Sequence, residues 1–372
     1  MLIGVPKEIK NHEYRVGLTP PSVQELVLHG HQVCIESSAG AGIGASDADY
    51  ESCGATIAKD VSRIFDTAEM IVKIKEPLAP ERAMLRPDQI LFTYLHLAPD
   101  PDQTKDLVES GSVCIAYETV TSPYGGLPLL APMSEVAGRL SIQAGANCLE
   151  KVHGGKGMLL GGVPGVDPAK VLIIGGGVVG THAAHIAIGM GADVTVVDRS
   201  AEALKALWRQ FGKPLNTVYS TRTVIEKHVL EADLVIGGVL IPGAKAPKLV
   251  TAEMIRSMEP GSVVVDVAID QGGCFETSHA TTHTDPTYVV DDVVHYCVAN
   301  MPGAVPRTST YALNNVTLPF VLKIADKGYK QALTDNPHLR NGLNVHKGEI
   351  TCKEVAENLN YDYRDPLEAM NS

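Results

Sequence analysis

A glycine-rich turn is the clearest chemical signal in the sequence. The apolar run 170–174 leads directly into Gly175-x-Gly177-x-x-Gly180, and the segment 181–190 is typical of a helix. In such a strand–turn–helix junction the first glycine permits a tight turn, the second lets the backbone approach a pyrophosphate, and the third lets helix and strand pack closely. Free amides at the start of the helix can then bind phosphate. We therefore expect a dinucleotide site here, the alternative being a glycine turn in a plain βα unit.

An aspartate at the end of the next apolar run indicates which dinucleotide would bind. Asp198 closes the run 193–198 and lies 23 positions after Gly175, close to the roughly 20-residue spacing of a carboxylate that binds ribose hydroxyls. Such a carboxylate repels the extra phosphate of NADP, whereas the adjacent Arg199 could attract it. NAD is therefore the expected cofactor. FAD fits less well, because the turn lies in the middle of the chain and no second flavin-binding element is visible.

Polar residues that follow other predicted strands are candidates for catalysis. Arg15 follows the first strand, Lys75 and His96 end the runs 70–75 and 90–96, and Asp270 ends a run that begins at Ser262. Ligands of open α/β sheets bind at the carboxyl ends of the strands. If the strands are parallel, two cations and a histidine share one edge and suit a small anionic substrate such as a 2-oxo or 2-amino acid. The alternatives are solvated surface charges for the cations, a core histidine, and an aspartate that caps a turn.

The elements that must position these residues alternate between strands and helices. Strands are expected at 2–5, 32–35, 70–74, 90–95, 112–117, 170–174, 193–197, 234–236, 262–267 and 293–298, with helices near 22–28, 102–109, 133–152 and 311–333. This alternation predicts parallel α/β sheets. We expect two doubly wound Rossmann-like domains, joined by long helices across a cleft that can open and close. The first is discontinuous, comprising residues 1–128 and 306–372, and the second comprises 129–305.

Composition excludes several classes of partner. The chain has 372 residues and a net charge of −12, which opposes binding to nucleic acid or to anionic membrane surfaces. No run approaches the roughly 20 apolar residues of a membrane span, and the first residues lack the apolar core of a secretion signal. Seven cysteines without a Cys-x-x-Cys spacing favour reduced thiols and a cytoplasmic location. The histidine pairs 182/185 and 279/283 are better explained by packing than by metal binding, so no metal is expected.

The chain as a whole resembles the alanine dehydrogenase and pyridine nucleotide transhydrogenase family. The motifs that carry the resemblance extend over most of the sequence: Gly4-Val-Pro-Lys-Glu, Arg15-Val-Gly-Leu-Thr-Pro, Val72-Lys-Ile-Lys-Glu-Pro77, Tyr94-Leu-His96-Leu-Ala, Pro132-Met-Ser-Glu-Val-Ala-Gly-Arg139, the run from Gly237 to Lys248, Val267-Ala-Ile-Asp270-Gln-Gly-Gly and Val298-Ala-Asn-Met-Pro302.

The resemblance implies reversible oxidative deamination of L-alanine by NAD to pyruvate and ammonium. It implies that Arg15 and Lys75 bind the substrate carboxylate and that His96 and Asp270 are the catalytic pair. It also implies a homohexamer. The residues it implies for the NAD site, beside the glycines of the turn, are Ser134, Val178, Asp198, Ser220, Val239, Leu240, Val267, Ala268, Ile269, Asp270, Val298, Ala299, Asn300 and Met301.

Three other functions are compatible with the same motifs. The chain could be the soluble NAD-binding component of a proton-translocating transhydrogenase, which would need a membrane partner. It could be a noncatalytic dinucleotide-binding protein, although the four candidate polar residues argue against that. The third alternative is a dehydrogenase for another amino acid, such as lysine or saccharopine, because the sequence does not reveal the size of the substrate pocket.

Overall fold

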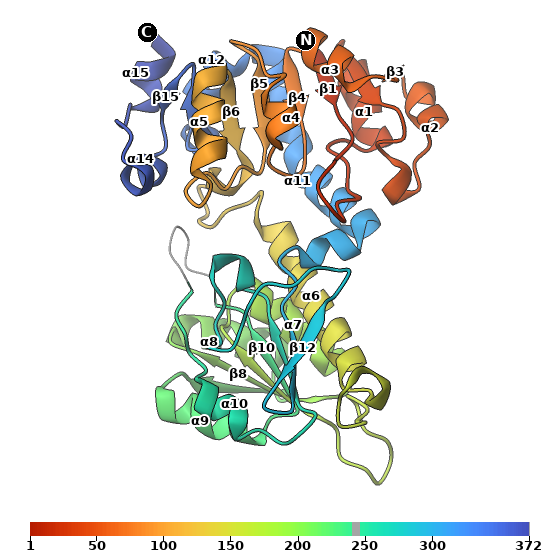
Figure 1. Ribbon diagram of the computed structural model, residues 1–372, viewed down its shortest axis with the longest axis vertical. Helices are drawn as coiled ribbons and strands as arrows, with labels where there is room; N and C mark the ends of the chain where they lie inside the picture. The colour runs from red at the N-terminus through yellow and green to blue at the C-terminus, as the bar shows by residue number, and fades with distance from the viewer. Residues whose placement is uncertain (240–245, 372) are drawn as a thin grey trace. The chain divides into compact units, whose positions relative to one another are not determined.

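The fold consists of two compact α/β units. The computed structural model describes residues 1–239 and 246–371. Unit 1 comprises Met1–Met133 and Val305–Ser372, and unit 2 comprises Ser134–Ala304 (Figure 1). The predicted fold class, with two doubly wound sheets of which the first is built from separate stretches of chain, is confirmed.

Unit 1 is built on an eight-stranded sheet in the order β15-β14-β6-β5-β4-β1-β2-β3. The strands β1 to β6 are parallel, whereas β14 pairs with β6 in the antiparallel direction. The strands are β1 (Leu2–Val5), β2 (Gln32–Glu36), β3 (Thr56–Ala58), β4 (Met70–Val72), β5 (Ile90–Thr93), β6 (Val113–Ala116), β14 (Leu343–His346) and β15 (Glu349–Ile350). Pairing of β14 with β6 shows that the C-terminal tail completes the sheet of the first unit, as Figure 1 shows in blue beside orange.

The helices of unit 1 come from both stretches of its chain. They are α1 (Pro20–Leu28), α2 (Asp47–Ser52), α3 (Val61–Thr67), α4 (Ala79–Arg82), α5 (Pro101–Ser110), α11 (Pro306–Lys327), α12 (Tyr329–Asp335), α13 (Pro337–Arg340), α14 (Lys353–Leu359) and α15 (Pro366–Asn371). The predicted helix 311–333 is two helices, since Gly328 adopts a positive φ of 75° between α11 and α12.

Unit 2 is built on a seven-stranded sheet in the order β12-β13-β11-β10-β7-β8-β9, in which β11-β10-β7-β8-β9 corresponds to β5-β4-β1-β2-β3 of unit 1. Its strands are β7 (Lys170–Ile174), β8 (Asp193–Asp198), β9 (Leu215–Tyr219), β10 (Leu234–Gly237), β11 (Val263–Asp266), β12 (Thr287–Val290) and β13 (Val293–Tyr296). Only β12 runs antiparallel among the described pairs of this sheet. Both sheets are therefore mostly parallel, with antiparallel pairing at one edge of each.

The helices of unit 2 include the long segment that enters it. They are α6 (Ala131–Cys148), α7 (Val178–Gly189), α8 (Ala201–Phe211), α9 (Arg222–Glu231) and α10 (Ala252–Arg256). Helix α6 ends earlier than the predicted 133–152, and a short 3-10 turn, Lys151–His153, follows it before Gly154. Within the described residues, no helix combines the length and the apolarity that crossing a membrane requires.

Buried apolar side chains from strands and flanking helices form a core in each unit. In unit 1 the strand residues Ile71, Leu91 and Cys114 pack with residues of the C-terminal tail such as Val345 and Val355. Such burial is the dominant favourable contribution to folding. The tail is therefore an integral part of unit 1, and the parallel strands leave their carboxyl ends at a common edge.

Candidate active site

The glycine turn lies between β7 and α7 and has the geometry that its sequence predicts. Gly175 has a φ of +104°, which disfavours any residue with a side chain. A Cβ on Gly180 would lie 1.8 Å from the carbonyl oxygen of Gly175, whereas one on Gly177 would have no neighbour within 4 Å. Helix α7 begins immediately after Gly177 without a side-chain cap, and the first amides of a helix have no acceptor within the helix. The turn can therefore receive a phosphate group.

Asp198 binds the glycine turn directly, a contact that the sequence analysis missed. Its Oδ2 accepts a hydrogen bond of 2.6 Å from the amide of Gly176, and its Oδ1 accepts one of 2.6 Å from Ser200. A Cβ on Gly176 would lie 2.9 Å from Leu207 and 3.3 Å from Oδ2 of Asp198. Glycine at position 176 therefore permits the close approach of Asp198. Asp198 fixes the turn and also stands at the end of β8.

The other residues predicted for the cofactor lie mostly at the carboxyl edge of the same sheet. Most follow a different parallel strand, whereas Ser134 comes from helix α6 and Val178 is the first residue of helix α7. Leu240 lies outside the described residues. The groups are Ser220 after β9, Val239 after β10, Val267 to Asp270 after β11, and Val298 to Met301 after β13.

Replacement of Gly180 by alanine tests the turn. The added methyl group has no room beside the Gly175 carbonyl, so we expect the turn to distort, NAD affinity to fall at least about tenfold, and stability to fall by about 1–3 kcal/mol, as for overpacked sites. The matched control is Gly189→Ala on the same helix, where a Cβ meets nothing within 4 Å. Isothermal titration with NAD and thermal melting measure both effects. Equal behaviour of the two variants would contradict the proposed fit.

The two residues predicted to bind the substrate and one predicted catalytic residue lie at the carboxyl edge of the unit 1 sheet. Arg15, Lys75 and His96 follow β1, β4 and β5, which are adjacent and parallel. The strands are shorter than predicted: β4 ends at Val72 and β5 at Thr93, so Lys75 and His96 stand on the connecting loops. Loops at this edge are the usual place for binding residues in such sheets.

Arg15 is buried and held in place by a neighbouring carboxylate. Its Nε donates to Oε1 of Glu13 at 2.7 Å, its Nη2 donates to Oε2 at 2.5 Å, and its Nη1 contacts the sulfur of Met133 at 3.0 Å. Only 2% of its surface is exposed. Arg15 is therefore not a solvated surface charge. Glu13 was not predicted from the sequence, although it stands two positions before Arg15.

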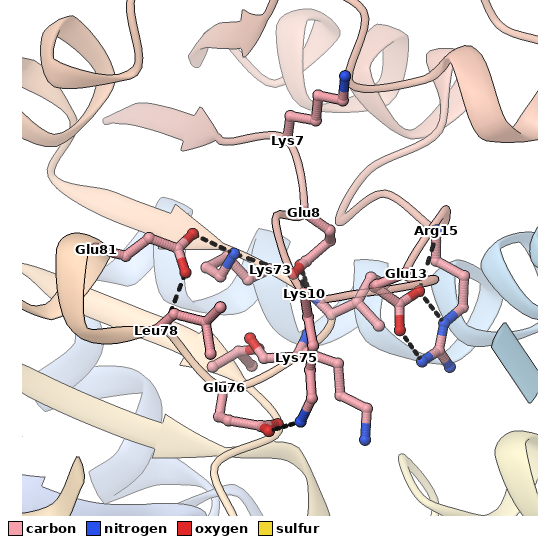
Figure 2. Close-up of polar contacts among 12 residues, drawn as sticks. Lys7, Glu8, Lys10, Glu13, Arg15, Lys73, Lys75, Glu76, Leu78 and Glu81 are labelled. Atoms are coloured by element: carbon pink, nitrogen blue, oxygen red, sulfur yellow. Dashed lines mark hydrogen bonds and ion pairs between the residues drawn. The ribbon is translucent and has the colours of Figure 1, made fainter. Parts of the chain in front are cut away.

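Lys75 is a half-buried cation on the same edge. Among the residues that the structure describes, no acceptor forms a hydrogen bond or ion pair with its Nζ, whereas Lys10 pairs with Glu76 (Figure 2). Burial lowers the pKa of Lys75; Glu76 opposes this shift, and the charges of Arg15 and Lys10 add to it. An anionic ligand would relieve the repulsion between these cations, as opposite charges favour the ionised form.

A buried charge network fixes the loop that carries Lys75. Oε1 of Glu8 accepts the amides of Ile74 at 2.7 Å and Lys75 at 3.3 Å, and Oε2 accepts Nζ of Lys73 at 3.1 Å. Lys73 also donates to Glu81 at 2.6 Å, and Glu81 accepts the amide of Leu78 at 2.8 Å (Figure 2). Burial raises the pKa of Glu8, and Lys73 opposes that rise. No member of this triad was predicted from the sequence as a site residue.

His96 stands on a strained loop with its ring accessible. Its φ is +51°, and its amide donates to Oε1 of Glu118 at 2.6 Å, with Nδ1 3.8 Å from the same oxygen. The ring stacks on Tyr94, whose hydroxyl donates to the carbonyl of Leu129. The side chain is 40% exposed, which rules out a core histidine. Strain of this kind occurs preferentially at functional sites.

Asp270 lies beyond the end of its strand rather than on it. Strand β11 ends at Asp266, and Asp270 is an exposed residue of the 3-10 turn Ile269–Gln271. The predicted strand was too long because the apolar residues 267–269 continue the pattern of β11 into the turn. Asp270 nevertheless lies at the carboxyl edge of the unit 2 sheet, with the other residues predicted for the cofactor.

Two domain descriptions of one protein family match successive parts of the chain. The description "Alanine dehydrogenase/PNT, N-terminal domain" matches residues 4–137, and "Alanine dehydrogenase/PNT, C-terminal domain" matches residues 141–353. The second match extends beyond unit 2 into α11 to α14 of unit 1. The family boundary in sequence therefore differs from the division of the fold.

Individual relatives cover nearly the whole chain. An alanine dehydrogenase from Halomonas elongata is 60% identical over 98% of both chains, and one from Geobacillus stearothermophilus is 58% identical over 98% of both. A solved L-alanine dehydrogenase is 53% identical, covers 97% of this chain and 99% of its own, and has a TM-score of 0.94. A transhydrogenase from Sinorhizobium meliloti, at 24% identity over 95% of this chain and 99% of its own, has a TM-score of 0.80 and shares the fold. The chain belongs to the alanine dehydrogenase/PNT family.

Proposed function

We propose that this chain catalyses the reversible, NAD-dependent oxidative deamination of L-alanine to pyruvate and ammonium. Full-length relatives named alanine dehydrogenase, at 53–60% identity, support this activity. The geometric observation that carries it is the presence of Arg15 and Lys75 at one edge of the unit 1 sheet, where no described residue accepts a hydrogen bond from Nζ of Lys75. Two cations held there suit the carboxylate that alanine and pyruvate share.

NAD fits the residues of unit 2. The open surroundings of Gly177, the exclusion of a side chain at Gly180 and the first amides of α7 suit a pyrophosphate. The Asp198 carboxylate at the end of β8 suits ribose hydroxyls and disfavours a further phosphate. When bound, NAD supplies the hydride acceptor. The remaining groups after β9, β10, β11 and β13 would line the rest of its site.

The substrate residues have separate tasks in this proposal. Arg15, already oriented by Glu13, and Lys75 bind the carboxylate and so limit the substrate to the reacting geometry. Oxidation at the alanine Cα leaves an iminium, which water must attack to give a carbinolamine; protonation of its amino group and loss of its hydroxyl proton then break the C–N bond and release pyruvate and ammonium. His96 accepts a proton from that water, because histidine is the most frequent proton-transfer group in enzymes and its ring is accessible. Asp270 is the second candidate for this proton transfer.

We further propose that each of the two structural units corresponds to one functional domain. Residues 1–128 and 306–372 would form the substrate domain, and residues 129–305 the NAD-binding domain, which the division into unit 1 and unit 2 supports. The family resemblance also supports assembly into a homohexamer. A cytoplasmic location is supported by the seven cysteines, all of which are free thiols.

A screen of NAD reduction across amino acids tests the activity. Purified full-length protein is expected to reduce NAD with L-alanine in preference to lysine or saccharopine, and to oxidise NADH with pyruvate plus ammonium but with neither alone. NADP is expected to be the poorer cofactor. Reduction of NAD without any amino acid, or NAD binding without turnover on any of them, would reject the proposal and favour a transhydrogenase component or a noncatalytic protein respectively.

A further inference from the structure

The turn that carries Asp270 is fixed by a buried carboxylate. Asp266, at the end of β11, is fully buried. Its Oδ2 accepts hydrogen bonds from the amide of Cys274 at 2.8 Å, the amide of Phe275 at 3.3 Å and the hydroxyl of Ser278 at 2.6 Å, while Oδ1 accepts the amide of Ala268 at 3.2 Å. One side chain therefore satisfies donors at both ends of the segment 267–278.

A lysine binds the carbonyl groups of the same turn. Nζ of Lys248 donates to the carbonyl oxygen of Gly272 at 2.5 Å and to that of Phe275 at 2.8 Å. The amide of Ala246 donates to the carbonyl of Gln271 at 2.9 Å. Amides of the turn thus donate to the Asp266 carboxylate, and carbonyls of the turn accept from the Lys248 ammonium. The backbone of Phe275 takes part in both kinds of contact, through its amide and its carbonyl.

The turn itself has a conformation that needs such support. Gly272 and Gly273 have φ values of +94° and +77°, and a Cβ on Gly273 would lie 2.5 Å from Oδ2 of Asp266. Burial raises the pKa of Asp266, and the hydrogen bonds from Ser278, Phe275 and Cys274 and the charge of Lys248 oppose that rise. An isolated glycine-rich turn would sample many conformations, because glycine has the greatest backbone freedom.

We propose that Asp266 and Lys248 are positioning residues that preset the turn 267–275 and thereby the carboxylate of Asp270. This inference rests on the proposed function, in which Asp270 takes part in proton transfer. Neither positioning residue needs to touch substrate. Their contribution is to hold a reacting group within the narrow range of positions that catalysis requires, where a displacement of about 1 Å costs about 100-fold in rate.

Lys248 provides a sharper test than Asp266, because Lys248 is exposed. Its side chain can therefore be replaced without changing a buried charged group. We expect Lys248→Met to lower kcat for alanine oxidation about 10- to 100-fold. The KM for alanine should change less than about threefold, because the carboxylate-binding residues lie in unit 1. Lys248→Arg keeps donors for both carbonyls and should recover most of the lost kcat. Lys227→Met, an exposed lysine of α9, is the matched control and should behave as the parent protein.

Amide hydrogen exchange measures how firmly Asp266 and Lys248 hold the turn, and it does so without relying on catalytic activity. In Lys248→Met the amides of 267–278 should exchange at least about tenfold faster, with β7 and α7 unchanged and the melting temperature within a few degrees of the parent. Asp266→Asn, which places an NH₂ group against an amide donor, should accelerate exchange in the same segment. If the parent protein proves inactive on alanine, the proposed function is rejected. The exchange result still tests whether Asp266 and Lys248 hold the turn. Unchanged exchange, or a kcat for Lys248→Met equal to that of Lys227→Met, would overturn the inference.

Discussion

Replacement of His96 by alanine is expected to lower kcat for alanine oxidation by about 10²–10⁴-fold, the usual contribution of a positioned proton-transfer group. NAD affinity should stay within about threefold, because the glycine turn and Asp198 belong to unit 2. The imidazole is accessible and already oriented by stacking on Tyr94. Steady-state kinetics in both directions and titration with NAD measure the two quantities.

His96→Asn separates the imidazole from the backbone that carries it. Asparagine tolerates a positive φ better than most residues, so this variant should keep the loop at φ +51° but lose the proton acceptor. We expect it to be as inactive as His96→Ala. His29→Ala, an exposed histidine at the end of α1, is the control. Near-parental kcat in His96→Asn would show that only the loop conformation matters and would reject the assigned role.

Replacement of Lys73 by methionine is expected to lower the free energy of unfolding by about 3–5 kcal/mol, the usual cost of breaking a buried ion pair from one side. Lys73 is fully buried between Glu8 and Glu81, so its loss leaves two buried carboxylates without their cation. Because Glu8 also binds the amides of Ile74 and Lys75, the KM for alanine should rise as well. Urea unfolding at fixed protein concentration and alanine kinetics measure the effects.

Neutralising the partners distinguishes charge from packing in this network. The triple variant Lys73→Met, Glu8→Gln, Glu81→Gln removes all three charges and should be more stable than Lys73→Met alone, since glutamine still accepts backbone amides. Lys59→Met, an exposed lysine after β3, should unfold at the parental urea concentration. A Lys73→Met protein as stable as Lys59→Met would show that the triad contributes nothing.

The glycine turn and the sheet edges were predictable because their signals are local. A positive φ at Gly175 and the absence of space beside Gly180 restrict those positions to glycine whatever the rest of the chain does. Parallel strands place their carboxyl ends together, which is why Arg15, Lys75 and His96 could be assigned to one edge. Strands β9 and β14 escaped prediction because polar residues such as Asn216 and Asn344 interrupt their apolar patterns.

The partners of the site residues could not be predicted in the same way. Glu8 is 65 positions from Lys73 in the sequence, and a lysine with two glutamates reads equally well as exposed charges. Glu118 contacts His96 across a sequence separation of 22 positions, and Lys248 contacts Gly272 across a separation of 24 positions. Nothing in their types or spacing distinguishes them from solvated side chains, whose pairing contributes little stability at a surface.

By itself, the sequence determined the fold class, the turn that suits NAD and the strand ends from which candidate site residues emerge. These follow from backbone geometry and from the period of apolar residues. Only the tertiary structure decided which charges are buried and paired: Glu13 with Arg15, the triad behind Lys75, and the Asp266 and Lys248 contacts behind Asp270. Burial makes those pairings strong because water no longer competes for them, and burial is a property of the whole fold rather than of any one segment.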